Sequence, residues 1–206
     1  MSHTKQLTSL QLDALKEAAN IGAGNAAGAL AQFLGRRIDM SVPRTALISC
    51  ADIASYAGLE EDSQSISIAF RVIGDLPGHF LMLLSEKTGL SLLKGLLPET
   101  KQVEIDNMGE LEESCLKEVG NIMTASFLIA LSVFLKVNLM NSLPEMTICE
   151  GGLFSELLLD EFKCSDAKAL MLETRFHESE ENLNIYLFFL PTETSLKKLL
   201  KKLGLP

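Results

Sequence analysis

Two groups of polar residues in this 206-residue chain have the same spacing. Each group is a short polar residue followed at fixed intervals by a glutamate, an asparagine and a proline: Asp13, Glu17, Asn20 and Pro43, then Ser114, Glu118, Asn121 and Pro144. An asparagine amide both donates and accepts hydrogen bonds, so it can orient a water molecule, and a glutamate can pair with a cation on a partner. These residue types suit the positioning of reactants.

The two groups lie 101 residues apart, and the same offset aligns further residues of the two halves. It places Leu15-Lys16-Glu17 on Leu116-Lys117-Glu118, and it also matches an alanine, a leucine and a phenylalanine further along. Agreement over so many positions is not expected by chance for residues of ordinary frequency. The sequence therefore indicates an internal duplication.

A helix must position each group, because positions i, i+4 and i+7 share one face of a helix that turns about 100° per residue. We call Asp13, Glu17 and Asn20 the first strip, and Ser114, Glu118 and Asn121 the second strip. The next position along each strip is small, Gly24 or Ala125, which suits close approach by another molecule. The alternative is an ordinary exposed helix face, but asparagine is a mediocre helix-interior residue, and its repetition beside glutamate disfavours that alternative.

Hydrophobic periodicity predicts the same order of elements in both halves. Long helices are expected from about Ser9 to Gly35 and from Met108 to Lys136, and a short strand follows each, at Arg37–Val42 and Val137–Leu143. Strand pairs follow at Ser65–Ile73 with Phe80–Leu84 and at Ala169–Phe176 with Leu183–Leu190. Amphipathic helices close the halves near Lys87–Leu97 and Thr194–Leu203.

These elements predict an α+β fold, formed as one pseudo-twofold-symmetric domain over residues 1–206. The repeat halves cover approximately residues 9–97 and 108–203, and Pro98–Asn107 is too short to be a long flexible linker. Two copies of about 100 residues are too few and too long for a solenoid. We therefore expect the two long helices to pack on a shared, largely antiparallel sheet.

Composition narrows the function classes. The formal net charge is −9 and the only lysine cluster, near Lys197–Lys202, fits the solvated face of a terminal helix, so nucleic acid is not expected as a partner. The N-terminus lacks a secretory signal and no apolar run suggests a membrane span, so we expect a cytoplasmic protein that does not contact membrane. Four cysteines without metal-ligand spacing and three isolated histidines suggest reduced thiols and no histidine-based catalysis.

The glycine-rich run Gly22–Gly28 looks superficially like a dinucleotide-binding loop. Its last glycine is one residue too far along, and no apolar strand precedes it. We expect these glycines to allow close helix packing or close approach by a docked partner.

The spacing of both groups resembles the motif of the CheC-type phosphatases of chemotaxis, a family that includes CheX and FliY. That motif is Asp or Ser, three residues, Glu, two residues, Asn, twenty-two residues and Pro, and this chain matches it twice. The resemblance implies a hydrolase that removes the aspartyl phosphate of a CheY-type response regulator in two-component signalling. It also implies that Glu17, Asn20, Glu118 and Asn121 are catalytic, with Asp13, Pro43, Ser114 and Pro144 as supporting residues.

Acyl phosphate hydrolysis needs a water held in line with the leaving carboxylate and neutralisation of phosphoryl charge. The resemblance assigns Mg²⁺ and a lysine to the receiver, so no cofactor of the chain's own is expected. Asn20 or Asn121 would orient the water, while Glu17 or Glu118 would pair with the receiver lysine. We expect both sites to be competent at unequal rates.

The rival hypothesis is a non-enzymatic adaptor whose strips only dock CheD or flagellar and chemotaxis proteins. The resemblance also implies that the deamidase CheD is a partner of CheC proteins, so both activities can coexist. CheX-type relatives carry one motif and dimerise, whereas this chain carries both motifs. The resemblance is therefore greatest to CheC, and a monomer is expected.

Overall fold

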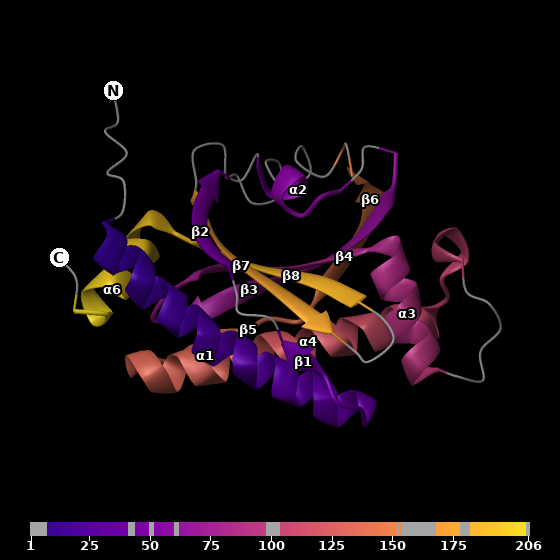
Figure 1. Ribbon diagram of the computed structural model, residues 1–206, viewed down its shortest axis with the longest axis horizontal. Coiled ribbons are helices and arrows are strands. Elements are labelled where there is room, and N and C mark those ends of the chain that lie inside the picture. The colour runs from indigo at the N-terminus through magenta and orange to yellow at the C-terminus, as the bar shows by residue number, and fades with distance from the viewer. Residues whose placement is uncertain are drawn as a thin grey trace.

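Two long helices of equal length, α1 (Ser9–Leu34) and α4 (Glu110–Leu135), carry the two strips (Figure 1). The computed structural model describes residues 8–40, 44–49, 52–59, 62–97, 104–151, 153, 168–177 and 182–204. Thr8 begins α1 with a capping box to Gln11, and Gly35 ends it in the left-handed conformation at φ 65°. Helix α4 begins with an acidic first turn, which its dipole favours, and ends at Lys136 with φ 54°.

The strands form one eight-stranded sheet in which all pairs are antiparallel. The strands of the first half are β1 (Asp39–Met40), β2 (Arg44–Ser49), β3 (Gln64–Gly74) and β4 (Gly78–Ser85). Those of the second half are β5 (Leu139–Asn141), β6 (Glu145–Glu150), β7 (Lys168–His177) and β8 (Asn182–Pro191). The strand order is β1-β7-β8-β4-β3-β5, with β2 also on β7 and β6 also on β3.

This order is symmetric about the contact between β4 and β8. Each half places its long hairpin in the centre of the sheet and its two short strands on the long strand of the other half. The two halves are therefore interleaved, and the expectation of a mixed helical and antiparallel fold with a shared sheet is confirmed. The repeated order of elements is also what an internal duplication would produce.

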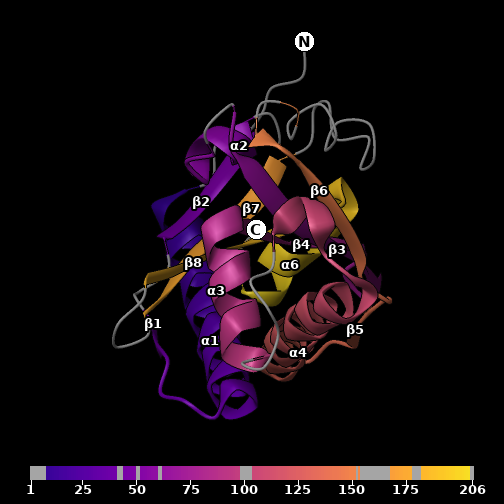
Figure 2. The ribbon, with the colours of Figure 1, turned by 90° about the vertical axis from the view of Figure 1, so that its right-hand side faces the viewer.

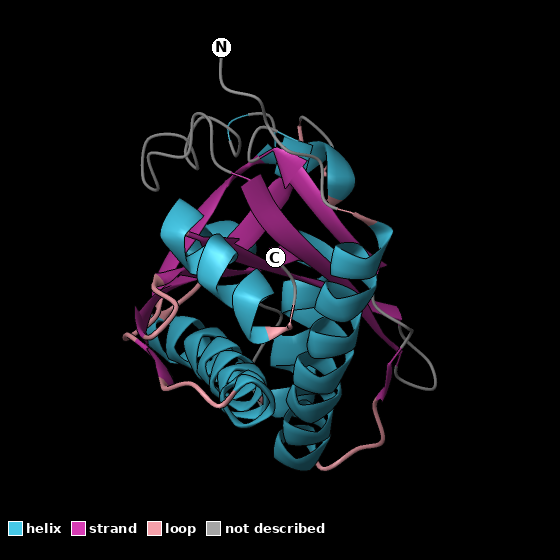
Figure 3. Ribbon diagram, turned by 90° about the vertical axis from the view of Figure 1, so that its left-hand side faces the viewer, coloured by secondary structure: helices cyan, strands magenta, loops and turns pink. Residues whose placement is uncertain are grey.

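Helices α1 and α4 lie side by side under one face of the sheet, with α3 (Glu86–Leu96) and α6 (Glu193–Lys202) at opposite ends (Figures 1 and 2). The main core fills the space between these helices and the sheet. A short helix, α2 (Ile53–Tyr56), covers the other face (Figure 3). There Ile53 packs in a second cluster with Leu83 and Phe188. Alternate residues of the central strands supply the two cores, as a sheet covered on both faces requires.

The two long helices make their close approach at Gly22. A Cβ added there would lie 2.5 Å from the Phe127 ring, which itself packs on Phe80 with ring centroids 5.0 Å apart. A small residue of the first half thus faces a large side chain of the second half. The expectation that a glycine of this run serves helix packing is confirmed at Gly22.

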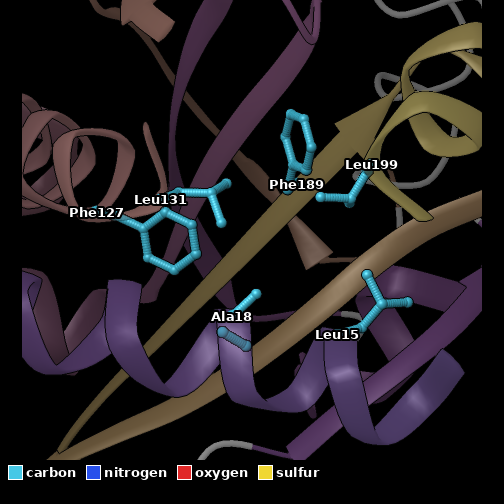
Figure 4. A pocket seen from close by; sticks show the side chains of 7 residues that line it. Leu15, Ala18, Phe127, Leu131, Phe189 and Leu199 are labelled. Atoms are coloured by element: carbon cyan, nitrogen blue, oxygen red, sulfur yellow. The ribbon is translucent and has the colours of Figure 1, made fainter. Parts of the chain in front are cut away.

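A small gap remains beside this contact, between α1, α4, β8 and α6. Figure 4 shows the apolar side chains around it, and they include Leu15, Phe127, Phe189 and Leu199. The gap has a volume of ≈ 10 Å³, about the space of one water, and offers no polar lining. It is a packing defect of the core and not a ligand site.

Three elements of the structure are not among the sequence-based expectations: strands β2 and β6 and helix α2. The two strands are missed because each short strand is expected to end at its proline. The lysines of α6 are exposed, as expected, and two of them also form contacts. Lys198 Nζ donates to the Asp75 carboxylate at 3.2 Å, and Lys202 Nζ donates to the carbonyl of Lys136 at 3.3 Å. These contacts tie α6 to the β3–β4 turn and to the end of α4.

No segment is expected from the sequence to be able to span a membrane, but helix α4 has the length and apolar composition to do so. Within the described part of the chain it alone is long and apolar enough by length and composition, with a mean hydropathy of 1.7 over its most apolar window. Half of that window is buried inside the fold, and Leu116, Val119, Met123 and Phe127 are core residues. A core helix of a soluble protein accounts for this composition.

Candidate functional site

The two strips lie on the outer faces of α1 and α4 with matching exposure. Asp13 and Glu17 are exposed and Asn20 is half-buried, and Ser114, Glu118 and Asn121 repeat this order. Neither glutamate forms a hydrogen bond or ion pair with any other described residue. Both carboxylates are therefore available to a partner, as the sequence predicted.

The first strip continues over an open surface. Gly24 is exposed, and a Cβ added there would meet nothing within 4 Å. Ala125, the matching residue of α4, is half-buried. The small floor predicted next to each strip is therefore present, and it is more open at Gly24.

Pro144, the proline of the second motif, lies where the edge strand loses register with β3. Asn141 pairs with Val72 and Glu145 pairs with Ala69, so four steps along one strand face three steps along the other. This is the geometry of a β-bulge, and a proline suits it because no ladder donor is needed there. Pro144 therefore belongs to a bulge between β5 and β6 rather than to the end of a strand.

Ser142 closes the ladder at this bulge. Its backbone N–H donates to the carbonyl of Arg71, and its hydroxyl accepts from the Arg71 N–H, each at 2.9 Å. The register on either side of the first motif's proline has the same offset, since Met40 pairs with Phe176 and Arg44 with Glu173. Pro43 itself lies outside the described residues.

The bulge brings a second amide to the second strip. Asn141 Nδ2 donates to Asn121 Oδ1 at 2.9 Å and to the carbonyl of Ser142 at 3.1 Å. No side-chain hydrogen bond joins Asn20 to another described residue. The two asparagines that the sequence treats as equivalent thus have different surroundings.

Sequence reasoning missed a pair of leucines that extend the strips. Leu10 lies three residues before Asp13 and is 66% exposed, and Leu111 lies three residues before Ser114 and is 60% exposed. Both lie on the same helix line as the glutamates, to within about 20° at 100° per residue. The repeat offset relates them, and that signal was available in the sequence, but a leucine at helical spacing is read as a core residue.

The surroundings of the second strip are acidic. Glu113 pairs with Lys117 one turn along α4, and Cys115 is half-buried between the strip and the core. Burial and the nearby Glu112 carboxylate raise the pKa of the Cys115 thiol. Cys115 and Cys149 are free and half-buried, as expected, and Cys50 and Cys164 lie outside the described residues.

These features define an α+β domain that presents one polar strip on each of two equivalent helices. A family model described as the CheC-like family matches residues 10–46, which contain the first motif. The chain is 33% identical over 198 residues to the CheY-P phosphatase CheC of Bacillus subtilis (strain 168), covering 94% of each chain. The chain belongs to the CheC-like family.

Solved structures show the same fold at lower identity. The crystal structure of Thermotoga maritima FliY matches with a TM-score of 0.76 and 21% identity, over 96% of this chain and 98% of that chain. FliM in a FliM–SpeE complex from H. pylori matches with a TM-score of 0.71 and 10% identity, over 97% of each chain. The resemblance read from the motif spacing is therefore confirmed at the level of family and fold.

Proposed function

We propose that this protein is a phosphatase that hydrolyses the aspartyl phosphate of a CheY-type response regulator. The observation that carries the proposal is the exposed glutamate beside a half-buried asparagine, at the same positions of two equivalent helices. The named activity of the relative from B. subtilis, similar over nearly its whole length, supports the same reaction. The site residues remain Glu17, Asn20, Glu118 and Asn121.

In the proposed reaction the oxygen of a water attacks phosphorus as the bond to the aspartyl oxygen breaks. The electron pair of that bond stays on the receiver's carboxylate, and both protons of the water go to the phosphate, which leaves as H₂PO₄⁻. Asn20 or Asn121 holds the water in line, and the exposed Glu17 or Glu118 pairs with a lysine of the receiver. Mg²⁺ belongs to the receiver in this proposal and neutralises phosphoryl charge there.

The exposed leucines supply an apolar contact to the same docking surface. Leu10 and Leu111 each lie one helical turn before the polar residues, where a docked receiver would cover them. In the second half the surface continues at Ile129, which is 62% exposed and on the helix line of Glu118. An apolar anchor next to a charged pair is a usual composition for a specific interface.

The test is the decay of a phosphorylated CheY-type receiver with wild-type protein, Asn20→Ala, Asn121→Ala and the double variant. Each single variant should retain activity and the double variant should not accelerate decay. The control is Asn25→Ala, which changes an exposed asparagine of α1 whose amide only bonds the carbonyl of Ile21. Loss of all turnover in one single variant would refute two working sites, and an active, folded double variant would refute the role of the asparagines.

A second candidate function is that of a non-enzymatic adaptor. The shared fold with FliM favours it, because that structure was solved in a complex with another protein. We propose CheD as a further partner and a monomeric, cytoplasmic protein in either case. Binding of the receiver without faster decay, measured with and without CheD, would favour the adaptor.

A further inference from the structure

We infer that Asn141, at the bulge beside Pro144, is a positioning residue for Asn121. This inference rests on the proposed function, because it assigns how the second strip holds its asparagine. Asn141 is the last residue of β5, opposite Val72, at the point where the register of the edge strand shifts. The sequence comparison of the two halves did not find it, because Met40 occupies the matching position of the first half.

The orientation of both amides follows from one backbone carbonyl. The carbonyl of Ser142 can only accept, so the atom of Asn141 that lies 3.1 Å from it is the donating nitrogen. The same nitrogen lies 2.9 Å from Asn121, which must therefore turn its oxygen toward Asn141. Asn121 is left with its own NH₂ group and one oxygen lone pair for the receiver side.

The backbone around Asn141 is itself fixed on β3. The Ser142 N–H and hydroxyl oxygen bond the carbonyl and N–H of Arg71, each at 2.9 Å, and the Ser142 hydroxyl donates to the carbonyl of Leu143 at 2.8 Å. Val72, the partner of Asn141, is 3% exposed and belongs to the main core. A chain of contacts thus runs from the core sheet through the bulge to the amide of Asn121.

Such a contact lowers the cost of orienting the amide in the transition state. An unsupported asparagine side chain must lose rotational freedom each time it holds a water, whereas Asn121 is held before the receiver arrives. The donated hydrogen bond also polarises the amide and strengthens its N–H groups as donors. The second strip is therefore preorganised in a way that the described surroundings of Asn20 do not provide.

The test uses Asn20→Ala as the background, so that all turnover depends on Asn121. Replacing Asn141 by methionine, the residue of the first half, should lower kcat about three- to tenfold, as expected for one hydrogen bond, and change KM by less than about twofold. Asn141→Asp offers Asn121 only hydrogen-bond acceptors, so the amide of Asn121 must rotate to point its nitrogen toward residue 141. In this variant kcat should fall at least as far. An unchanged kcat in both variants would overturn the inference.

The Asn121→Ala background distinguishes the positioning role of Asn141 from a merely structural role. There turnover depends on the first strip, so adding Asn141→Met should change neither kcat nor KM. An equal loss in this background would show general damage and would overturn the inference. Thermal unfolding of each variant reports whether the fold is intact.

A second readout does not depend on turnover. In the ¹⁵N-labelled wild-type protein the side-chain NH₂ of Asn121 should be rigid, and in Asn141→Met its order parameter should fall. Unchanged Asn121 resonances and order parameters would overturn the inference. If wild-type protein does not hydrolyse the phosphorylated receiver at all, the proposed function fails, and the resonances alone then decide whether Asn141 orients Asn121.

Discussion

The contact between α1 and α4 predicts that Gly22 is intolerant of the smallest side chain. The methyl group of Gly22→Ala would lie 2.5 to 2.7 Å from three ring atoms of Phe127. Phe127 is 1% exposed and packs against Phe80, so its ring cannot turn into open space. Either the helices separate or the ring leaves its preferred position.

Overpacking of this kind costs about 1 to 3 kcal/mol, while replacing a helical glycine by alanine returns about 1 kcal/mol. The expected net loss of stability is therefore up to about 2 kcal/mol, which lowers Tm by up to about 8 °C in a protein of this size. Gly24 and Gly28 lie on the same helix, and a Cβ at either meets nothing within 4 Å. Gly24→Ala and Gly28→Ala should each stabilise the protein by about 0.5 to 1 kcal/mol.

Thermal unfolding followed by circular dichroism measures all three variants under the same conditions. A Gly22→Ala protein as stable as Gly24→Ala would refute the packing argument. The double variant Gly22→Ala/Phe127→Leu supplies a further check, because a smaller side chain at 127 leaves room for the new methyl group. Its destabilisation should be smaller than the sum of the two single changes by about 1 kcal/mol.

Three further predictions concern other regions. Leu10→Ala and Leu111→Ala should each raise KM for the phosphorylated receiver at their own strip about five- to tenfold, because alanine buries less apolar surface than leucine when the receiver docks. Unchanged KM values in steady-state assays would exclude the leucines from the interface. Burial and the Arg71 charge lower the pKa of His79 below its usual 6.5, so the unfolded chain binds that proton more readily and the free energy of unfolding falls as pH drops from about 7 to 5. His79→Gln should flatten this fall in urea titrations, and an identical pH profile would contradict it. The Cys115 thiol, whose pKa is raised, should react with iodoacetamide at pH 8 more slowly than a cysteine in a short peptide, and an equal rate would count against its burial.

The long helices could be predicted because their apolar residues recur at helical period, and Gly35 marks the end of the first helix. The strips followed from helix geometry alone, and their exposure agrees with it. Strands β2 and β6 could not be predicted in the same way. Each begins directly after a motif proline, which in sequence indicates the end of a strand, and only the bulge explains how the edge continues beyond it.

Asn141 escaped prediction for a different reason. Comparison of the halves detects what both copies share, and position 40 holds a methionine. The contact from Asn141 to Asn121 depends on the fold bringing an edge strand beside α4 across 20 residues of sequence. Leu10 and Leu111 are the opposite case, because both halves contain them and only their exposure in the structure separates them from core leucines.

The interleaved sheet also determines how the chain can be divided. Strands β1 and β2 complete the sheet on β7, and β5 and β6 complete it on β3, so each half alone would have an uncovered strand edge. Cutting the chain between α3 and α4 should therefore yield two fragments that fold only by complementation. Helices α1 and α4 therefore cannot be studied as separate modules, because the sheet has the arrangement of two strand-exchanged halves within one chain.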